Sequence, residues 1–210
     1  MENKELSACT PIAVNFEKFN QNALLPYGLE IAAIQKSMSD FIDFLGFLNL
    51  QLKTKDMPRL ECFLMPANFS SIVGEFMNIN IPKYCKTLVK NKYHNGHPDL
   101  VPIGMFPNDA ILHATEGVEI KGSRHSSGWQ GHNPEEIHLM VFNFDSNTAV
   151  DFQNDIAPKS FKFRGVYLAK LELEDWTFSG RSETSRRTIT ATVNKLGTAK
   201  MQHNWIYKDI

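Results

Sequence analysis

The chain has 210 residues, a formal net charge of −1 at pH 7, 42% hydrophobic residues and 21% charged residues. This composition is ordinary for a soluble globular protein, and the length suits one domain with a sizeable core. No apolar run is long enough to cross a membrane, and Met1–Glu5 is not followed by the apolar core of a secretion signal. The 3 cysteines are far apart and form no Cys-x-x-Cys pair, which excludes a zinc ribbon and favours a reduced, cytoplasmic chain.

The first part of the chain, residues 1–92, is expected to be mainly helical. Between Gly28 and Leu52 the apolar residues recur at helical spacing, which predicts one long amphipathic helix. We expect a shorter helix from Asn68 to Met77. Another is expected to begin at Pro82, because proline is favoured in a first turn, and to end near Asn91.

The second part, residues 93–210, contains patterns typical of strands. Gly117–Lys121 is expected to be the central strand, and a polar, glycine-rich loop follows it at Gly122–Pro134. Further strands are expected at Leu100–Val101, Ile111–Leu112, Glu136–Phe144, Phe163–Leu173 and Thr188–Val193, with a short helix within residues 147–158. No repeat or linker divides the chain. These patterns predict a single α/β domain, with helices first and a mixed sheet after them.

Two acidic residues and a lysine stand out near the middle of the chain. Glu119 and Lys121 lie two positions apart in the expected strand, so they face one side while the apolar residues between and before them face a core. If Asp99 starts the neighbouring strand, its carboxylate lies beside that of Glu119. Adjacent carboxylates repel each other unless positive charge joins them, and Lys121 or a divalent ion such as Mg²⁺ supplies that charge. The pattern favours metal-assisted phosphodiester hydrolysis; the alternative is a turn aspartate and a surface ion pair worth under ~1 kcal/mol.

Positive charge is gathered in two segments of the chain. The first lies between Gly180 and Lys200. It contains five basic residues, Arg181, Arg186, Arg187, Lys195 and Lys200, and only one acidic residue, Glu183. The second contains Lys83, Lys86, Lys90 and Lys92. Such an asymmetry is expected when a polyanion docks on one face, although a solvated helix face explains the first segment equally well.

Pro98-Asp99 and Glu119-Ile120-Lys121, placed after a helix-rich N-terminal third and before further strands, resemble the PD-(D/E)XK nucleases. Within this superfamily the layout resembles that of the type II restriction endonucleases. The resemblance implies a restriction-endonuclease-like fold, in which a mixed central sheet is flanked by helices. Residues 93–210 would then carry the catalytic sheet and the DNA-recognition loops.

The resemblance also implies a mechanism. Asp99 and Glu119 would ligate Mg²⁺ together with the backbone carbonyl of Ile120, and Lys121 would position the attacking water and stabilise the charge that develops on the scissile phosphate. Water would attack in line and the 3′ oxygen would leave, which gives 5′-phosphate ends. Family members differ in whether a third acid takes part, and Glu30 and Glu116 are both open candidates here.

If this catalytic assignment holds, two loops are candidates for DNA recognition. Their polar and basic side chains can donate to phosphates and base edges, and their glycines permit close approach. The candidate residues are Ser123, Arg124, His125, Gln130, His132 and Asn133 in the first loop, and Arg181, Ser182, Thr184, Arg186 and Arg187 in the second. The alternative is that both are solvent loops with a few structural ion pairs.

The sequence therefore predicts a Mg²⁺-dependent type II restriction endonuclease that hydrolyses double-stranded DNA at a specific short site. A homodimer is expected, because a two-fold pair of subunits suits a palindromic site, and a cognate DNA methyltransferase is expected in the cell. The alternatives are a repair or recombination nuclease on the same fold, a DNA-binding module that does not cleave, and a structural protein with a chance motif. A His-Asn-His nuclease built on His125, His132 and Asn133 is disfavoured because the strand–helix layout it needs does not follow them.

Overall fold

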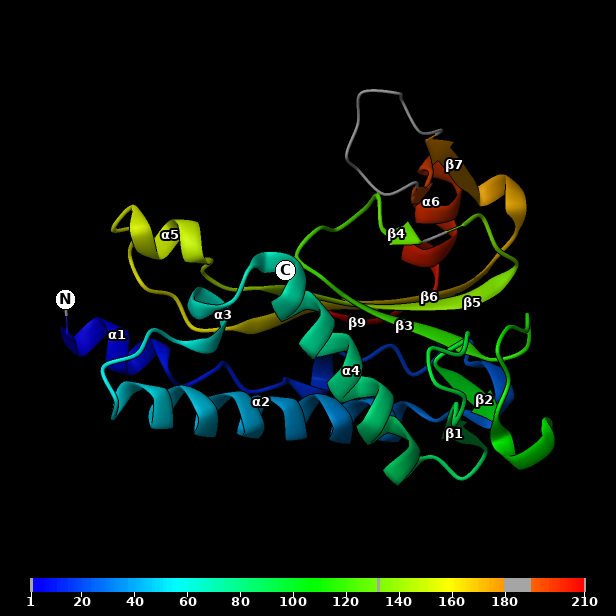
Figure 1. Cartoon of the computed structure of the whole chain (residues 1–210), viewed down its shortest axis with the longest axis horizontal. Coiled ribbons are helices and arrows are strands. Elements are labelled where there is room, and N and C mark those ends of the chain that lie inside the picture. The colour runs from blue at the N-terminus through cyan, green and yellow to red at the C-terminus, as the bar shows by residue number, and fades with distance from the viewer. Residues whose placement is uncertain (1, 132, 180–189, 210) are drawn as a thin grey trace.

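The computed structural model describes residues 2–131, 133–179 and 190–209. A six-stranded sheet with the order β1-β2-β3-β5-β6-β9 forms the middle layer (Figure 1). Its strands are β1 (Leu88–Lys90), β2 (Leu100–Pro102), β3 (Val118–Ser123), β5 (Ile137–Asp145), β6 (Lys162–Leu171) and β9 (Trp205–Lys208). β3 and β5 run parallel and the other neighbouring pairs of this sheet are antiparallel, so the sheet is mixed.

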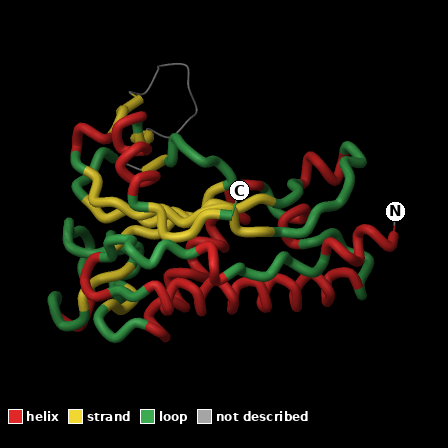
Figure 2. The backbone as a smooth tube through the Cα atoms, turned by 180° about the vertical axis from the view of Figure 1, so that it is seen from behind, coloured by secondary structure: helices red, strands yellow, loops and turns green. Residues whose placement is uncertain are grey.

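Helices cover one face of this sheet, and a second, smaller sheet and a helix cover the other. The described helices are α1 (Glu2–Ala8), α2 (Ile31–Lys53), α3 (Leu60–Phe63), α4 (Pro66–Tyr84), α5 (Ala149–Gln153) and α6 (Lys195–His203), with 3-10 turns at Phe16–Lys18, Pro26–Gly28, Pro107–Asp109 and Leu173–Asp175. α2 and α4 lie against one face, as the views from front and back both show (Figures 1 and 2). The small antiparallel sheet, made of β4 (Gln130–Gly131), β8 (Thr190–Val193) and β7 (Trp176–Ser179), lies with α6 against the other face.

β5 shows why the large sheet is a buried middle layer. Met140 and Phe142 pack into a core with α2 and α4, whereas Leu139 and Val141 pack into a second core with Met201 of α6. Because successive side chains point to opposite faces, a strand that is buried on both faces needs an unbroken apolar run. That is what the sequence of β5 provides.

α4 crosses β3 at close range, and a glycine permits it. A Cβ atom on Gly122 of β3 would lie 2.7 Å from Cβ of Val73 in α4, closer than side chains can approach. On the helix side of the same crossing, a Cβ on Gly74 would meet the Gly122 backbone nitrogen at 3.4 Å, an ordinary contact. This crossing brings the second half of α4, with Asn78, to the junction of β2 and β3.

Much of the predicted order of elements is confirmed. The helix predicted between Gly28 and Leu52 is α2, and the short helix predicted within residues 147–158 is α5. The strands predicted at Leu100–Val101, Gly117–Lys121, Glu136–Phe144, Phe163–Leu173 and Thr188–Val193 correspond to β2, β3, β5, β6 and β8, with ends shifted by a few residues. The α/β class, the mixed sheet and the helical N-terminal part are therefore as expected.

Two predictions about local structure are wrong. Pro82 does not begin a helix; it lies in the last turn of α4, which ends at Tyr84, and the strand β1 (Leu88–Lys90) lies where the predicted helix would have continued to Asn91. Ile111–Leu112 is not a strand, because the amide of Asn91 occupies the place of a partner strand. Asn91 Nδ2 donates to the Ile111 carbonyl at 2.8 Å, and the Ile111 backbone N–H donates to Asn91 Oδ1 at 3.1 Å.

Some elements carry no strong sequence signal and were not predicted. They are α1, α3, α6, β1, β7, β9 and the short β4 inside the glycine-rich loop. Cys9, Cys62 and Cys85 are buried and free. Across the part of the chain that the structure describes, no helix is both long enough and apolar enough to pass through a membrane.

Candidate functional site

Asp99 lies immediately before β2 and interacts with β3 through its side chain. β2 and β3 pair only at Leu100 and Val118, so the Ile120 backbone N–H is left without a strand partner on this side. Asp99 Oδ2 accepts this N–H at 2.8 Å, and Asp99 Oδ1 accepts from Asn78 Nδ2 of α4 at 3.2 Å. Because the β2–β3 pairing stops at this point, the free Ile120 N–H can hold the Asp99 carboxylate against the middle of β3.

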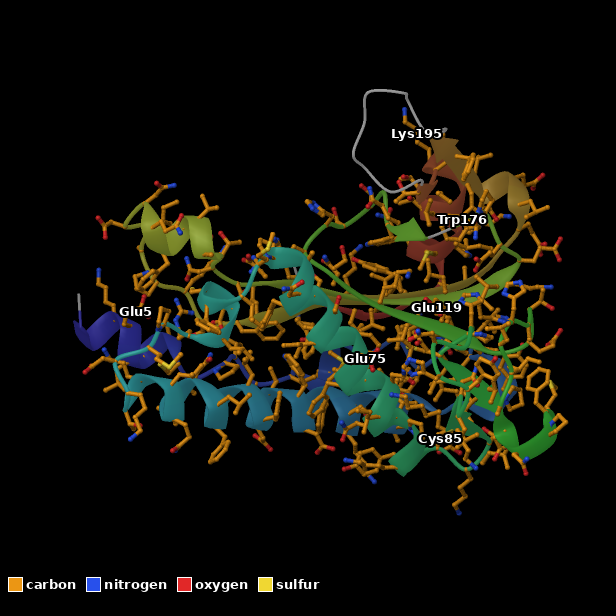
Figure 3. The ribbon with its side chains drawn as sticks, viewed as in Figure 1. Glu5, Glu75, Cys85, Glu119, Trp176 and Lys195 are labelled. Atoms are coloured by element: carbon orange, nitrogen blue, oxygen red, sulfur yellow. The ribbon has the colours of Figure 1, made fainter. Side chains whose placement is uncertain are left out.

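β3 presents Glu119 and Lys121 on one face, as the alternation of its sequence predicts. Val118 and Ile120 are buried in the core formed with α2 and α4. Lys121 Nζ lies 3.2 Å from Glu119 Oε1, and the carboxylates of Asp99 and Glu119 are close enough to interact directly. The structure thus brings Asp99, Glu119 and Lys121 together at the junction of β2 and β3, in the region labelled by Glu119 in Figure 3.

Two further residues that sequence reasoning did not assign to the site, His97 and Glu135, complete this charge cluster. His97 Nδ1 lies 3.0 Å from Glu119 Oε2, and His97 Nε2 lies 2.6 Å from Glu135 Oε2. His97 is thus an ion-pair partner of both carboxylates and links β3 to the start of β5. Their only sequence signal is position, since His97 directly precedes the Pro98-Asp99 dipeptide and Glu135 lies just before β5.

The buried charges shift one another's pKa values. Burial and the charge of Glu119 raise the pKa of Asp99 well above its usual range. Burial acts on Glu119 in the same direction, but His97 and Lys121 outweigh it and lower the pKa of Glu119. Burial would lower the pKa of His97, but Glu119 and Glu135 raise it to about 9. At neutral pH, Glu119 is therefore an anion between two cations, and Asp99 is the acid whose ionisation costs most.

The oxygen donors at this junction suit a hard divalent cation such as Mg²⁺. The described residues include no group of three or more His, Cys, Asp or Glu side chains arranged to hold a metal. The predicted ligand set is different in kind, because it consists of the Asp99 and Glu119 carboxylates and the Ile120 carbonyl. Asn78 adds an oxygen, Oδ1, that is buried and has no hydrogen-bond partner. A cation here would offset the repulsion that raises the pKa of Asp99.

Two hollows flank the acid pair. One, of about 370 Å³, begins at Lys121 and lies between the start of α4 and the loop after β3. The other, of about 620 Å³, begins at Asp99 and Asn78 and is bounded by residues 89–96. A small cavity of about 20 Å³, which shares Lys121 with the first hollow, is lined by Glu119, His97 and Trp176. Asp99 therefore opens onto the larger hollow, Lys121 lines the smaller one, and Glu119 lines the small cavity.

The first predicted DNA-recognition loop is only partly free to contact a ligand. The Arg124 guanidinium donates to the Ser146 carbonyl and hydroxyl, each at 2.6 Å, and to the Asn147 carbonyl, so it anchors the loop to the turn after β5. The Ser123 hydroxyl accepts from the His125 backbone N–H. The side chains of His125, Gln130 and Asn133 are exposed.

The remaining predicted DNA-binding residues lie outside the described part of the chain. They are His132 in the first loop and Arg181, Ser182, Thr184, Arg186 and Arg187 in the second.

Neither candidate for a third acid touches the acid pair in the described structure. Glu30 is exposed at the N-terminal boundary of α2, and Glu116 accepts a hydrogen bond from the Tyr27 hydroxyl at 2.9 Å. The helix that contributes a side chain to the site is α4, through Asn78, and not α2 as the Glu30 assignment assumed. The sequence could not distinguish the two, because the crossing of α4 over β3 is a tertiary feature.

No family model matches the chain, and neither the curated proteins nor the solved structures give a significant match.

Proposed function

We propose that this chain is a Mg²⁺-dependent endodeoxyribonuclease of the PD-(D/E)XK type. One observation carries the proposal. Asp99, Glu119 and Lys121 were selected from a short sequence motif, and their side chains meet beside one another where β2 and β3 part in a mixed sheet. Asp99 and Glu119 are 20 positions apart in the sequence, and a chance motif gives no reason for them and Lys121 to converge on one partly buried position.

The residues divide the chemistry between them. Asp99 and Glu119, with the Ile120 carbonyl, would hold Mg²⁺, which when bound polarises the scissile phosphate and activates water. Lys121 places a positive charge beside the reacting group, where it can orient the attacking water and stabilise the developing negative charge. His97, held by Glu135, keeps Glu119 ionised and fixes its orientation.

The finer assignment follows from the same resemblance. We propose double-stranded DNA as the substrate, cleavage at a specific short site to leave 5′-phosphates, and a homodimer that cuts both strands. The polar loop after β3 supports a DNA-facing site, because its exposed residues His125 and Gln130 line the same hollow as Lys121, and Asn133 of this loop is exposed as well. A cognate methyltransferase that protects the host DNA belongs to this proposal.

Digestion of a defined plasmid with and without Mg²⁺ tests the proposal. We expect discrete fragments with 5′-phosphate ends from the unmodified chain, and none from Asp99→Ala or Lys121→Ala, although both variants should still bind DNA. Asp145→Ala and Lys159→Ala are matched controls, because these residues form an ion pair at 2.6 Å near the far end of β5.

The outcomes separate the candidate functions. Retention on DNA without cleavage would favour a binding module, and smeared or branch-specific cleavage would favour a repair nuclease. Normal cleavage by either site variant would refute the site assignment. If the unmodified chain neither bound nor cleaved DNA, the proposal as a whole would be refuted.

A further inference from the structure

The hollow of about 370 Å³ beside Lys121 has rigid walls. α4 forms one wall, with Ser70 lining the hollow, and Lys121 and the loop after β3 form the other. Gly122 lets α4 lie directly on β3, so the distance between these walls is fixed by backbone packing. The volume falls within the range of about 300–1,000 Å³ that is typical of small-ligand sites.

The loop that closes the hollow is held in place by hydrogen bonds from buried side chains. The Trp129 indole N–H donates to the His125 carbonyl at 2.9 Å, and Trp129 is only 2% exposed. Asn143 Nδ2 of β5 donates to the Ser123 carbonyl at 3.0 Å and to the His125 carbonyl at 2.9 Å. A ligand that enters the hollow therefore meets a site that is already formed, which reduces the entropy cost of binding.

The charges around the hollow favour an anion. Its lining residues, all of them described, include Lys121 and Arg124 but no aspartate or glutamate. The Arg124 guanidinium donates to neutral oxygens of Ser146 and Asn147, so no direct ion pair cancels its charge. The acids Asp145, Asp151 and Glu61 act on it only through space. The hollow on the other side of the acid pair carries mixed charge, because Glu75 and Asp99 line it together with Lys90 and Lys92, and Lys90 Nζ lies 3.4 Å from Glu75 Oε2. The excess of positive charge therefore lies in the Lys121 hollow.

Lys121 links this hollow to the acid pair. Lys121 lines the hollow, and its ammonium nitrogen lies 3.2 Å from Glu119 Oε1. A strand of nucleic acid carries one phosphate per nucleotide, so a strand whose phosphate lies at the acid pair must place the next phosphates a short distance to either side. The side with Lys121 and Arg124 attracts that charge more strongly than the other side, where Glu75 and Asp99 offset Lys90 and Lys92.

We propose that the Lys121 hollow binds the phosphate group that neighbours the scissile one in the same nucleic-acid strand. The inference rests on the proposed nuclease function and adds to it the direction in which the strand leaves the acid pair. Polar side chains of Ser70, His125 and Gln130 are placed to contact the phosphate or its sugar. Bound phosphate also sets the register of the strand, so the hollow is a positioning site.

Phosphate binding can be measured without cleavage by NMR, using the full chain in the absence of divalent ions. The probe is a 5′-phosphorylated thymidine dinucleotide, with inorganic phosphate as a second arm. We expect a saturable shift of the Trp129 indole N–H signal with the dinucleotide, and little shift of the Trp205 signal, which serves as an internal control. Inorganic phosphate should shift the same signal at concentrations at least tenfold higher. Equal affinity for both probes would overturn the assignment to a strand in favour of a free-phosphate site.

Two charge insertions on α4 provide a matched test. Ser70 lines the hollow, whereas its neighbour Ser71 is exposed and does not. Ser70→Glu places an acid in the hollow and should weaken dinucleotide binding at least fivefold, while Ser71→Glu adds the same net charge and should change it less than twofold. Equal effects of the two variants, or no Trp129 shift with the unmodified chain, would refute the inference. Because cleavage is assayed separately, a chain that cleaves plasmid but shows no such shift disproves this inference alone, and one that binds but never cleaves disproves the nuclease proposal alone.

Discussion

Replacing Asp99 by asparagine should stabilise the folded chain while it removes the candidate metal site. Asparagine keeps the size of the side chain and an oxygen that can accept the Ile120 N–H, which Asp99 accepts at 2.8 Å. It removes the negative charge that is buried beside Glu119. This charge is costly only in the folded state without a cation, so the substitution relieves the repulsion between the Asp99 and Glu119 carboxylates.

The magnitude follows from the pKa of Asp99, which burial and the charge of Glu119 raise from 3.8 to about 7. Such a change corresponds to about 4 kcal/mol at a pH where the carboxyl is ionised in both states. The asparagine amide brings buried N–H donors that need partners, so we expect about half of this gain, roughly 2 kcal/mol. For a chain of this size, that is a rise in Tm of about 4–8 °C.

The pH dependence fixes the sign of the effect. An acid whose pKa is raised by folding destabilises the folded state fully above the folded value, here about 7, and not at all below the unfolded value of 3.8. The gain from Asp99→Asn should therefore be largest at pH 8 and less than about half as large at pH 5. Thermal unfolding followed by circular dichroism, with a chelator present, measures the gain in stability at each pH.

Mg²⁺ and a matched variant complete the test. Adding Mg²⁺ should raise the Tm of the unmodified chain and leave that of Asp99→Asn unchanged, because a ligand stabilises only a state that binds it. In Asp109→Asn the same substitution should not raise Tm, since hydrogen bonds from Gly104 and Lys92 lower the pKa of Asp109. A lower Tm for Asp99→Asn at pH 8, or an equal gain at pH 5 and pH 8, would show that Asp99 is not strained by Glu119.

Two further substitutions test how the scaffold is held. Glu61→Gln should destabilise the fold by about 3–5 kcal/mol in urea unfolding, because Glu61 is 0% exposed and pairs with the buried Arg59 guanidinium at 2.7 Å. A loss under about 1 kcal/mol would mean that water reaches this pair. Gly122→Ala should lose about 1–3 kcal/mol by the same measurement, because its Cβ would press on Val73, whereas Gly74→Ala at the same crossing should be neutral or slightly stabilising. Equal losses of stability in Gly122→Ala and Gly74→Ala would show that the tight contact of the crossing is not at Gly122.

What the sequence could predict about this protein was local. The alternation of Val118 to Lys121 determines which side chains of β3 face the core, and the helical spacing after Gly28 determines α2. Both patterns act over a few residues, so a single sequence shows them. The same reasoning placed Asp99 beside Glu119, because the two were expected on neighbouring strands.

The parts that were missed depend on contacts between distant segments. His97 and Glu135 are 38 positions apart and meet only because the parallel pairing of β3 and β5 brings the start of β5 to the site. Asn78 reaches Asp99 because α4 crosses β3 at a glycine. No spacing rule connects such residues, and for the same reason the sequence pointed to Glu30 at the N-terminal boundary of α2 and gave no sign of Asn78 of α4.

The short β2 strand is the structural reason why a site exists at this place. Had β2 continued to pair with β3 in register, the Ile120 N–H would have bonded to a strand backbone, and Asp99 would have had no donor on β3 to hold it there. Pairing ends after Leu100 and Val118, so a side-chain carboxylate replaces a main-chain carbonyl. That exchange places a second negative charge beside Glu119, whose own charge His97 and Lys121 already balance. The excess charge therefore resides on Asp99, and this predicts that Asp99, rather than Glu119, determines how strongly the folded chain attracts a divalent cation.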